Sequence, residues 1–227
     1  MKYNSMKYRC IIFDCDGTLL DTLEDIAAAM NQSLIQHGFP AVPLEKYRDM
    51  VGWGIIRLAE LALPQEGRAE ETIQAVGNCA QRFMDEQAAD KYLARPYPGI
   101  RELLTGLSGL RQARKISTAV FSNKPDSALC PLIDDIFGPH TFDIVCGLRP
   151  GMAPKPDPQT VWELLAEMGK NPGDTIFMGD SEIDIETAKN SGCYPLGVSW
   201  GFRSRPTLET AGAARIIDRP EEIWELL

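Results

Sequence analysis

The sequence predicts an α/β protein, in which helices cover both faces of a parallel sheet and a helical segment is inserted after the first strand. Two observations support this fold class. Short apolar runs that end in polar residues alternate with helical patterns over most of the chain, and one long stretch near the N-terminus has helical periodicity without such runs. Alternation of strand and helix is typical of a doubly wound, Rossmann-like sheet.

Five apolar runs are predicted to be the strands of this sheet: residues 10–13, 116–121, 175–179, 194–198 and 214–217. A short continuous apolar run is typical of a strand that is buried on both faces. Helical patterns are predicted between the later strands, at residues 99–110, 128–137, 158–169 and 184–190. Ligands bind beyond the carboxyl ends of parallel strands, so the polar residues at those ends are the first candidates for a functional site.

The stretch between the first two strands, residues 22–95, is predicted to be an all-helical cap. Thr22 and Asp25 resemble a capping box at the start of a first helix. Gly38 and Pro40 are expected to end this helix. Further helices are expected over residues 44–50, 55–61 and 66–89. Residues 1–21 and 96–227 would then form the α/β core.

Composition and charge exclude several classes of function. The chain has 227 residues and a formal net charge of -9 without a basic stripe, so non-specific binding to nucleic acid is not expected. No apolar stretch resembles a signal core or a membrane span, which predicts a cytoplasmic protein without a membrane partner. The 6 cysteines form no C-x-x-C pair and are expected to be free thiols.

Asp14 and Asp16 are the strongest chemical signal, because they stand two residues apart directly after the first predicted strand. One carboxylate can attack phosphorus while the other transfers protons. Gly17 permits a tight turn after them. Two carboxylates repel a phosphate dianion, so this arrangement requires a cation, and Mg²⁺ prefers oxygen ligands. A calcium-binding loop is rejected, since Leu19 stands where that loop needs glycine.

Four motifs, in this order, resemble those of the phosphatase branch of the haloacid dehalogenase superfamily. They are Asp14-Cys15-Asp16-Gly17-Thr18, Ser122-Asn123-Lys124, Lys155-Pro156-Asp157-Pro158 and Gly179-Asp180-Ser181-Glu182-Ile183-Asp184. The resemblance covers nearly the whole chain, and the helical insertion stands where the family places its cap. It implies a Mg²⁺-dependent phosphatase that works through an aspartyl-phosphate.

The resemblance also implies the role of each motif residue. Asp14 would be the nucleophile, Asp16 the general acid and then base, and Lys155 the cation that offsets charge on Asp14 and phosphate. The metal would be held by carboxylates and a carbonyl at the strand ends, namely Asp14, Asp16 and Asp180, with Asp184 and Ser181 as secondary partners. The phosphoryl group would be held by the second motif and the first turn, namely Ser122, Asn123, Gly17 and Thr18.

Some of these residues have an ordinary structural interpretation as well. Asp184 can cap the helix expected at residues 184–190 instead of serving the metal, and both interpretations stay open. By themselves, Ser122 and Asn123 would suit a simple turn and Lys155 a solvated loop.

Other enzyme classes lack their signatures. No G-x-S-x-G nucleophile motif and no G-x-x-x-x-G-K-[ST] phosphate loop occurs, and the two histidines, His37 and His140, are interpreted as ordinary. Dehalogenase relatives lack the second acid, so Asp16 argues against dehalogenation. Residues 23–26 lack the histidine that is usual in mutases.

The expected substrate is a small phosphorylated metabolite, and the cap normally sets specificity in this family. Residues 21–26, 51–54 and 197–203 resemble phosphoglycolate phosphatase relatives, which makes 2-phosphoglycolate the first candidate. Pyrophosphate, sugar phosphates and phosphomutase activity stay open, and so does a catalytically silent binding module. Trp53 and Arg57 are candidate cap contacts to the substrate, although core packing and a surface position suit them equally well. A monomer and a homodimer are both compatible with the sequence.

Overall fold

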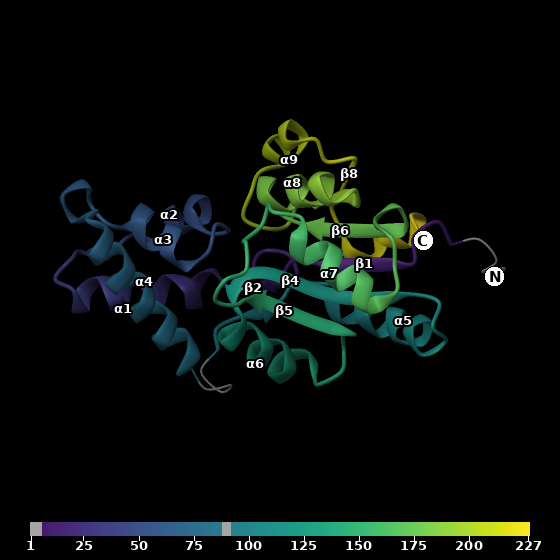
Figure 1. The fold of residues 1–227 in the computed structure, drawn as a ribbon, viewed down its shortest axis with the longest axis horizontal. Coiled ribbons are helices and arrows are strands. Elements are labelled where there is room, and N and C mark those ends of the chain that lie inside the picture. The colour runs from purple at the N-terminus through teal and green to yellow at the C-terminus, as the bar shows by residue number, and fades with distance from the viewer. Residues whose placement is uncertain (1–5, 88–91) are drawn as a thin grey trace.

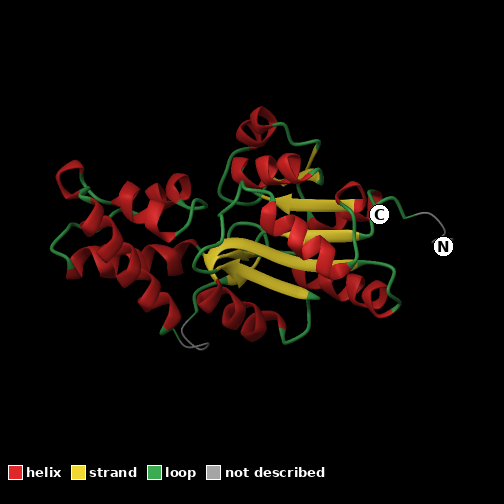
Figure 2. Ribbon diagram, in the orientation of Figure 1, coloured by secondary structure: helices red, strands yellow, loops and turns green. Residues whose placement is uncertain are grey.

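The computed structural model describes residues 6–87 and 92–227. It contains a six-stranded parallel sheet with helices on both faces and, beside it, a separate group of helices (Figures 1 and 2). The predicted α/β fold class is therefore confirmed. Within the described residues, no helix has the length and apolar character needed to cross a membrane.

The sheet has the strand order β5-β4-β1-β6-β7-β8, and every pair of neighbours is parallel. Its strands are β1 (Cys10–Phe13), β4 (Ser117–Pro125), β5 (Ile144–Leu148), β6 (Thr175–Gly179), β7 (Tyr194–Val198) and β8 (Arg215–Ile217). The first strand lies near the centre, and later strands extend the sheet to one side and then to the other. This order places the ends of β4, β1 and β6 next to one another, at the point where ligands bind in such sheets.

Helices cover both faces of this sheet: α5 (Ile100–Gln112), α6 (Asp126–Phe137), α7 (Gln159–Met168), α8 (Glu182–Ser191) and α9 (Arg205–Ala211). In β1, Ile11 and Phe13 join the hydrophobic cluster that contains α5 and α6, while Cys10 and Ile12 join the one that contains α7. None of these four side chains is exposed. Burial on both faces explains why the strand is a continuous apolar run.

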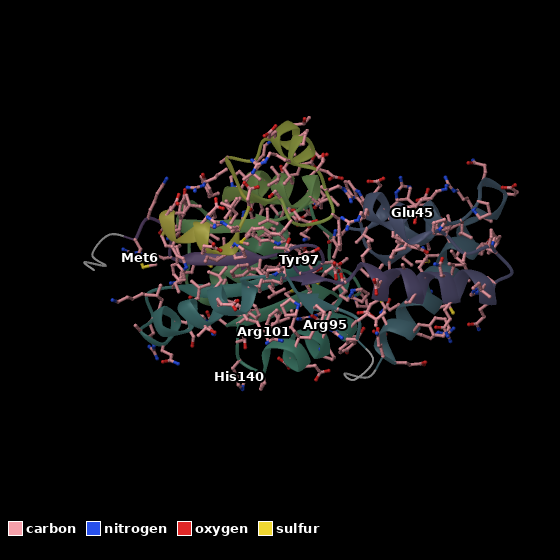
Figure 3. All side chains as sticks on the ribbon, turned by 180° about the vertical axis from the view of Figure 1, so that it is seen from behind. Met6, Glu45, Arg95, Tyr97, Arg101 and His140 are labelled. Atoms are coloured by element: carbon pink, nitrogen blue, oxygen red, sulfur yellow. The ribbon has the colours of Figure 1, made fainter. Side chains whose placement is uncertain are left out.

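The separate group consists of α1 (Leu23–Gln36), α2 (Leu44–Met50), α3 (Ile55–Ala62) and α4 (Glu70–Asp85). These helices surround a hydrophobic cluster of their own, in which Met30, Leu34, Tyr47 and Val76 are fully buried. The two segments that connect these helices to the core form a short antiparallel ladder of β2 (Leu20–Asp21) and β3 (Arg95–Pro96). Arg95, labelled in Figure 3, lies at this junction.

Most predicted elements agree with the structure, and the differences have local causes. The long helix expected over residues 66–89 is divided into a 3-10 turn (Gln65–Gly67) and α4, and residues 88–89 lie outside the described residues. Strands β2, β3 and β5 and helix α9 were not predicted. The 6 cysteines are free thiols, as expected.

The predicted capping box at the start of α1 is wrong. Thr22 is the N-cap residue but makes no capping hydrogen bond, because its hydroxyl donates to Asp16 at 2.6 Å. The carboxylate of Asp25 instead accepts hydrogen bonds from the backbone of Leu93 and Ala94, at 3.0 and 2.8 Å. Both side chains therefore tie the helix to the segments that connect it to the sheet.

Candidate active site

The polar ends of three adjacent strands meet at one edge of the sheet, as the sequence predicts. The backbone N–H of Asp14 donates to the carbonyl of Met178 at 2.9 Å, which continues the β1–β6 ladder one residue beyond the strand. Asp14 thus leaves the sheet beside Asp180. On the other side of β1, Ser122 and Asn123 lie within the last part of β4. All four residues are buried, with no more than 5% of each exposed.

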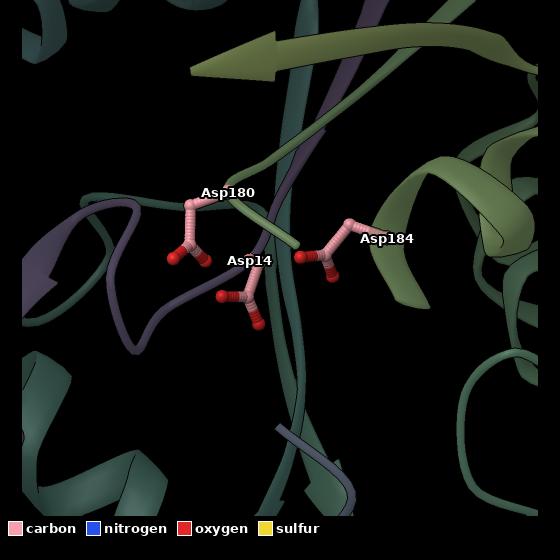
Figure 4. Close-up of side chains that lie close together, drawn as sticks. All are labelled: Asp14, Asp180 and Asp184. Atoms are coloured by element: carbon pink, nitrogen blue, oxygen red, sulfur yellow. The ribbon is translucent and has the colours of Figure 1, made fainter. Parts of the chain in front are cut away.

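An acidic cluster forms at this edge from Asp14, Asp180 and Asp184 (Figure 4). One carboxylate oxygen from each lies within 4.8 Å of the others, and all three residues are buried. The surrounding backbone approaches closely, because a Cβ at Gly17 would come within 2.4 Å of the Asp180 carboxylate. Gly17 also has a φ of +90°, which favours glycine. The sequence therefore needs glycine there to let the turn close over Asp180.

Lys155 joins two members of the cluster. Its Nζ donates to Asp14 Oδ1 at 2.6 Å and to Asp184 Oδ1 at 2.7 Å, and the residue is only 3% exposed. Burial by itself would lower the pKa of this ammonium group, but the two carboxylates raise it above its ordinary value. Lys155 is therefore a permanent cation, with a third N–H that can face a phosphoryl group.

The buried carboxylates carry more negative charge than Lys155 offsets. Burial raises the pKa of Asp14 well above its ordinary value, against the influence of Lys155, and the charges of Asp184 and Asp180 raise it further. Burial and the charge of Asp184 raise the pKa of Asp180 to about 7. A cation held between these oxygens would relieve this repulsion, and an all-oxygen donor set suits a hard divalent ion. The residues present therefore fit the metal that the fold family implies.

Asp184 serves the helix and the cluster at the same time. Helix α8 begins at Glu182 with Ser181 as its N-cap, two residues before the predicted start. Asp184 Oδ2 accepts hydrogen bonds from the hydroxyl and the backbone N–H of Ser181, at 2.6 and 3.1 Å, which completes a capping box. Its other oxygen accepts from Lys155. The capping interpretation and the site interpretation are thus both compatible with the structure.

The carboxylate of Asp16 pairs with the ammonium group of Lys124, a residue that was not among the predicted site residues. Its Oδ1 accepts from the Thr22 hydroxyl at 2.6 Å and from Lys124 Nζ at 3.3 Å. Lys124 is buried, which tends to lower its pKa, but the charge of Asp16 raises the pKa overall. Lys124 stands in the second motif, and a charged residue inside an otherwise buried strand is the signal that could have revealed its role.

The residues expected to bind phosphate divide into two groups. Ser122 Oγ accepts from the backbone N–H of Lys124 at 3.2 Å, and the described residues offer its hydroxyl hydrogen no acceptor, so it can donate to a ligand. Asn123 also lines the cleft. Thr18 is fully buried and donates to Asp180 Oδ1 at 3.4 Å. Gly17 and Thr18 thus lie against Asp180 and are not among the residues that line the cleft.

The cleft has two chemically different walls. The core wall carries the charged residues Asp14, Asp16, Lys124, Lys155, Asp180, Asp184 and Arg203. The helical wall is lined by apolar side chains and glycines, namely Ile26, Val51, Gly52, Gly54, Ile55, Leu58 and Met84. The predicted cap contacts Trp53 and Arg57 are not part of this wall. Trp53 is 39% exposed, and Arg57 pairs with Glu60 one turn along α3.

Arg203 is a second residue whose role the sequence did not indicate. Its guanidinium pairs with Glu182 at 3.1 Å and donates to the backbone carbonyls of Arg48, Asp49 and Val51 at the end of α2. The loop after β7 is thereby tied to the helical wall of the cleft.

Comparison with known proteins identifies the family of the chain. A family model for haloacid dehalogenase-like hydrolases matches residues 11–198. A phosphoglycolate phosphatase of Pseudomonas putida is 30% identical over 211 residues, covering 92% of this chain and 76% of that protein. A phosphoglycolate phosphatase of Caulobacter vibrioides is 33% identical over 213 residues, covering 91% and 85%.

A solved structure extends the similarity to three dimensions. The crystal structure of a protein from Lactobacillus delbrueckii subsp. bulgaricus, whose phosphoglycolate phosphatase activity is itself a prediction, has a TM-score of 0.80 and 33% identity. The alignment covers 98% of this chain and 99% of that one. The chain therefore belongs to the haloacid dehalogenase-like hydrolase family and is a phosphatase that resembles the phosphoglycolate phosphatases in sequence and fold.

Proposed function

We propose that the chain is a Mg²⁺-dependent phosphatase that hydrolyses a small phosphorylated metabolite through an aspartyl-phosphate on Asp14. The observation that carries this proposal is the placement of Asp14 in the acidic cluster, with Lys155 at 2.6 Å and the Ser122 hydroxyl on the neighbouring strand. The names of the relatives support 2-phosphoglycolate as the first candidate substrate.

Asp14 has one oxygen available for attack on phosphorus. Its Oδ1 is held by Lys155, so the proposed nucleophile is Oδ2. When bound, Mg²⁺ would be held by Asp14, Asp180 and the backbone carbonyl of Asp16 and would supply the positive charge that lets a phosphate dianion approach. Lys155 and the Ser122 hydroxyl would hold the phosphoryl oxygens while charge develops on them.

Asp16 would transfer the protons in both steps. In the first step the Asp14 oxygen bonds to phosphorus, the ester P–O bond breaks, and the leaving oxygen takes a proton from Asp16. In the second step the carboxylate of Asp16 takes a proton from water while the water oxygen attacks phosphorus. The bond between phosphorus and the Asp14 oxygen breaks, which releases phosphate and restores Asp14. The Thr22 hydroxyl and Lys124 Nζ both contact Asp16 Oδ1, at 2.6 and 3.3 Å, and hold this carboxyl group in place beside the site.

The helical segment would act as the cap in this scheme, with residues 22–95 as the cap and residues 1–21 and 96–227 as the core. Its apolar wall faces the charged site across the cleft. Exclusion of water by such a wall strengthens the electrostatic interactions inside the site and protects the intermediate.

The deciding test compares Mg²⁺-dependent hydrolysis of p-nitrophenyl phosphate by the wild type and by Asp14→Asn. We expect kcat to fall by roughly 10⁴-fold or more, since the amide is not a nucleophile and no other group takes its place. Circular dichroism would show whether both proteins are folded. Equal rates for the two proteins would contradict the proposal.

The intermediate and the substrate need separate measurements. Acid quenching with ³²P-labelled substrate should leave label on the wild type and none on Asp14→Asn. A panel of 2-phosphoglycolate, pyrophosphate and hexose 1-phosphates would rank the candidate substrates by kcat/KM. Release of phosphate from the hexose phosphate, as opposed to an isomerised sugar phosphate, would separate a phosphatase from a phosphomutase.

A further inference from the structure

The turn at residues 51–54 of the helical segment lies directly on the catalytic edge of the sheet. Gly52 and Gly54 have φ values of +120° and +87°, which favour glycine. A Cβ at Gly52 would lie 2.9 Å from Ile183, and one at Gly54 would lie 3.6 Å from the carbonyl oxygen of Asn123. A Cβ at Gly54 would make an ordinary van der Waals contact, but one at Gly52 would press on Ile183, so glycine at position 52 permits the close approach.

Asn123 makes the hydrogen bond that links this turn to the site. Its Nδ2 donates to the carbonyl of Gly52 at 2.9 Å and to the carbonyl of Lys155 at 3.2 Å. Its Oδ1 accepts from the backbone N–H of Lys155 at 2.8 Å. Both amide hydrogens and the amide oxygen are thus in use, and the residue is 4% exposed. A single side chain connects the helical wall, the end of β4 and the Lys155 loop.

A short path therefore joins the helical segment to the nucleophile. The Asn123 amide donates a hydrogen bond to the carbonyl of Gly52. The same amide forms hydrogen bonds with the backbone N–H and carbonyl of Lys155, and Lys155 Nζ donates to Asp14. The hydrogen bond to Gly52 is one of three that fix the orientation of the amide plane, in which Oδ1 faces the N–H of Lys155. When the turn moves away, Nδ2 loses that partner, and the amide loses one of the contacts that fix its rotation.

We propose that the side chain of Asn123 is a positioning residue that couples the seating of the helical segment to the placement of Lys155 against Asp14. The effect of this coupling on catalysis rests on the proposed phosphatase function, while the coupling itself is a property of the fold. The backbone of Asn123 stays free for the phosphoryl contact expected of it, because the coupling uses only the side-chain amide. Lys155 would be held fully in place only while the Gly52 turn rests on the core.

Arg203 offers a way to loosen the turn without changing Asn123. Its guanidinium donates hydrogen bonds to the carbonyls of Arg48, Asp49 and Val51, and within the described part of the chain it makes no hydrogen bond to Lys155 or Asn123. Arg203→Gln removes most of these bonds. Gly52→Ala is a second variant, which strains a φ of +120° and presses on Ile183. The two variants unseat the same turn by different routes.

Hydrogen exchange of the Lys155 amide, followed by NMR, tests the coupling independently of activity. This N–H bonds to Asn123 Oδ1, so we expect its exchange to accelerate roughly tenfold in both Arg203→Gln and Gly52→Ala. In the Asn123→Ala background, adding Arg203→Gln should produce no further acceleration at Lys155. An unchanged Lys155 amide in both turn variants would overturn the coupling.

A double-mutant cycle in kcat tests its catalytic consequence. With p-nitrophenyl phosphate, we expect Asn123→Ala to lower kcat by roughly 10- to 100-fold with little change in KM. Arg203→Gln should lower kcat in the wild type but not in Asn123→Ala, whereas independent structural roles would give additive effects and reject the coupling. A folded wild type without phosphatase activity would refute the proposed function, and the exchange measurement would still decide whether Asn123 links the turn to Lys155.

Discussion

The two walls of the cleft follow different physical rules. On the core wall every carboxylate of the acidic cluster has a partner from a distant part of the chain, as Lys155 shows by bonding to both Asp14 and Asp184. The helical wall presents side chains such as Leu58 and Met84, which make no directional contacts. The core wall can therefore set the reaction, while the apolar side chains of the helical wall can act only through shape and the exclusion of water.

This difference implies that changes on the two walls should have different kinetic effects. A change on the core wall alters the groups that the transition state of every ester uses, so all substrates should lose rate together. A change to an apolar side chain of the helical wall alters the space around the alcohol part of the ester, so it should alter the ratio between substrates.

Lys155→Met should have the largest effect in this comparison. It removes the cation from Asp14 and Asp184 with little change in side-chain length, and we expect kcat to fall by roughly 10³-fold for every substrate in the panel. Lys46→Met, on the exposed surface of α2, is the matched control. Retention of kcat within about threefold would show that Lys155 has only a structural role.

Asp180 should make the stability of the metal-free core depend on pH. Its folded pKa is raised from 3.8 to about 7 by burial and by Asp184, so the folded state binds the proton more tightly than the unfolded state. The unfolding free energy should therefore fall as the pH rises from 3.8 toward 7, because ionisation favours the unfolded chain in that range. Asp180→Asn should flatten this part of the profile.

Metal binding should counteract this loss of stability. At a Mg²⁺ concentration about 100 times the dissociation constant, the expected gain is about 2.7 kcal/mol. Urea unfolding at several pH values, with Mg²⁺ or with EDTA, measures both effects. If Asp180→Asn keeps the same pH slope and the same response to Mg²⁺ as the wild type, the assignment of Asp180 to the metal site is wrong.

Met84→Ala should have the smallest effect and the most selective one. It enlarges the helical wall, so we expect the ratio of kcat/KM for hexose phosphate to that for 2-phosphoglycolate to rise by up to roughly tenfold. Met168→Ala is the matched control, because Met168 lies at the end of α7, away from the residues that line the cleft, and its loss removes the same side-chain volume. An equal loss of rate for both substrates would mean that the helical wall does not select the alcohol group.

Much of the α/β part could be predicted because its information is local. The boundaries of β1, β6 and β7 agree with the predicted runs, since a strand buried on both faces is apolar along its whole length. The edge strand β5, Ile144–Leu148, was not predicted, and its residues are only partly buried in places, unlike those of β1. The division into cap and core remains a prediction, because the helices alone do not show where one folding unit ends.

The site was predictable where a residue type has no other good reason to stand at a strand end. This argument selected Asp14, Asp16 and Asp180, which the structure gathers at one edge of the sheet. It did not select Lys124, although this residue stands in a buried strand, and it could not select Arg203, since an isolated basic residue in a loop has no partner that the sequence reveals. Trp53 and Arg57 were proposed from their residue types, but the direction in which a side chain points depends on how its turn or helix packs, and Trp53 lies in the turn before α3 while Arg57 lies on α3.

Five of the six strands of the large sheet, the order of the motifs and the chemical types at the strand ends can be derived from the sequence, because hydrophobic runs and turns are local properties of the chain. Which charges meet depends on the folded structure. Lys155 is 141 residues from Asp14 along the chain, and Lys124 is 108 residues from Asp16, yet each pair lies within hydrogen-bonding distance. Electrostatic interactions depend on separation in space and on burial, and both exist only once the sheet has formed.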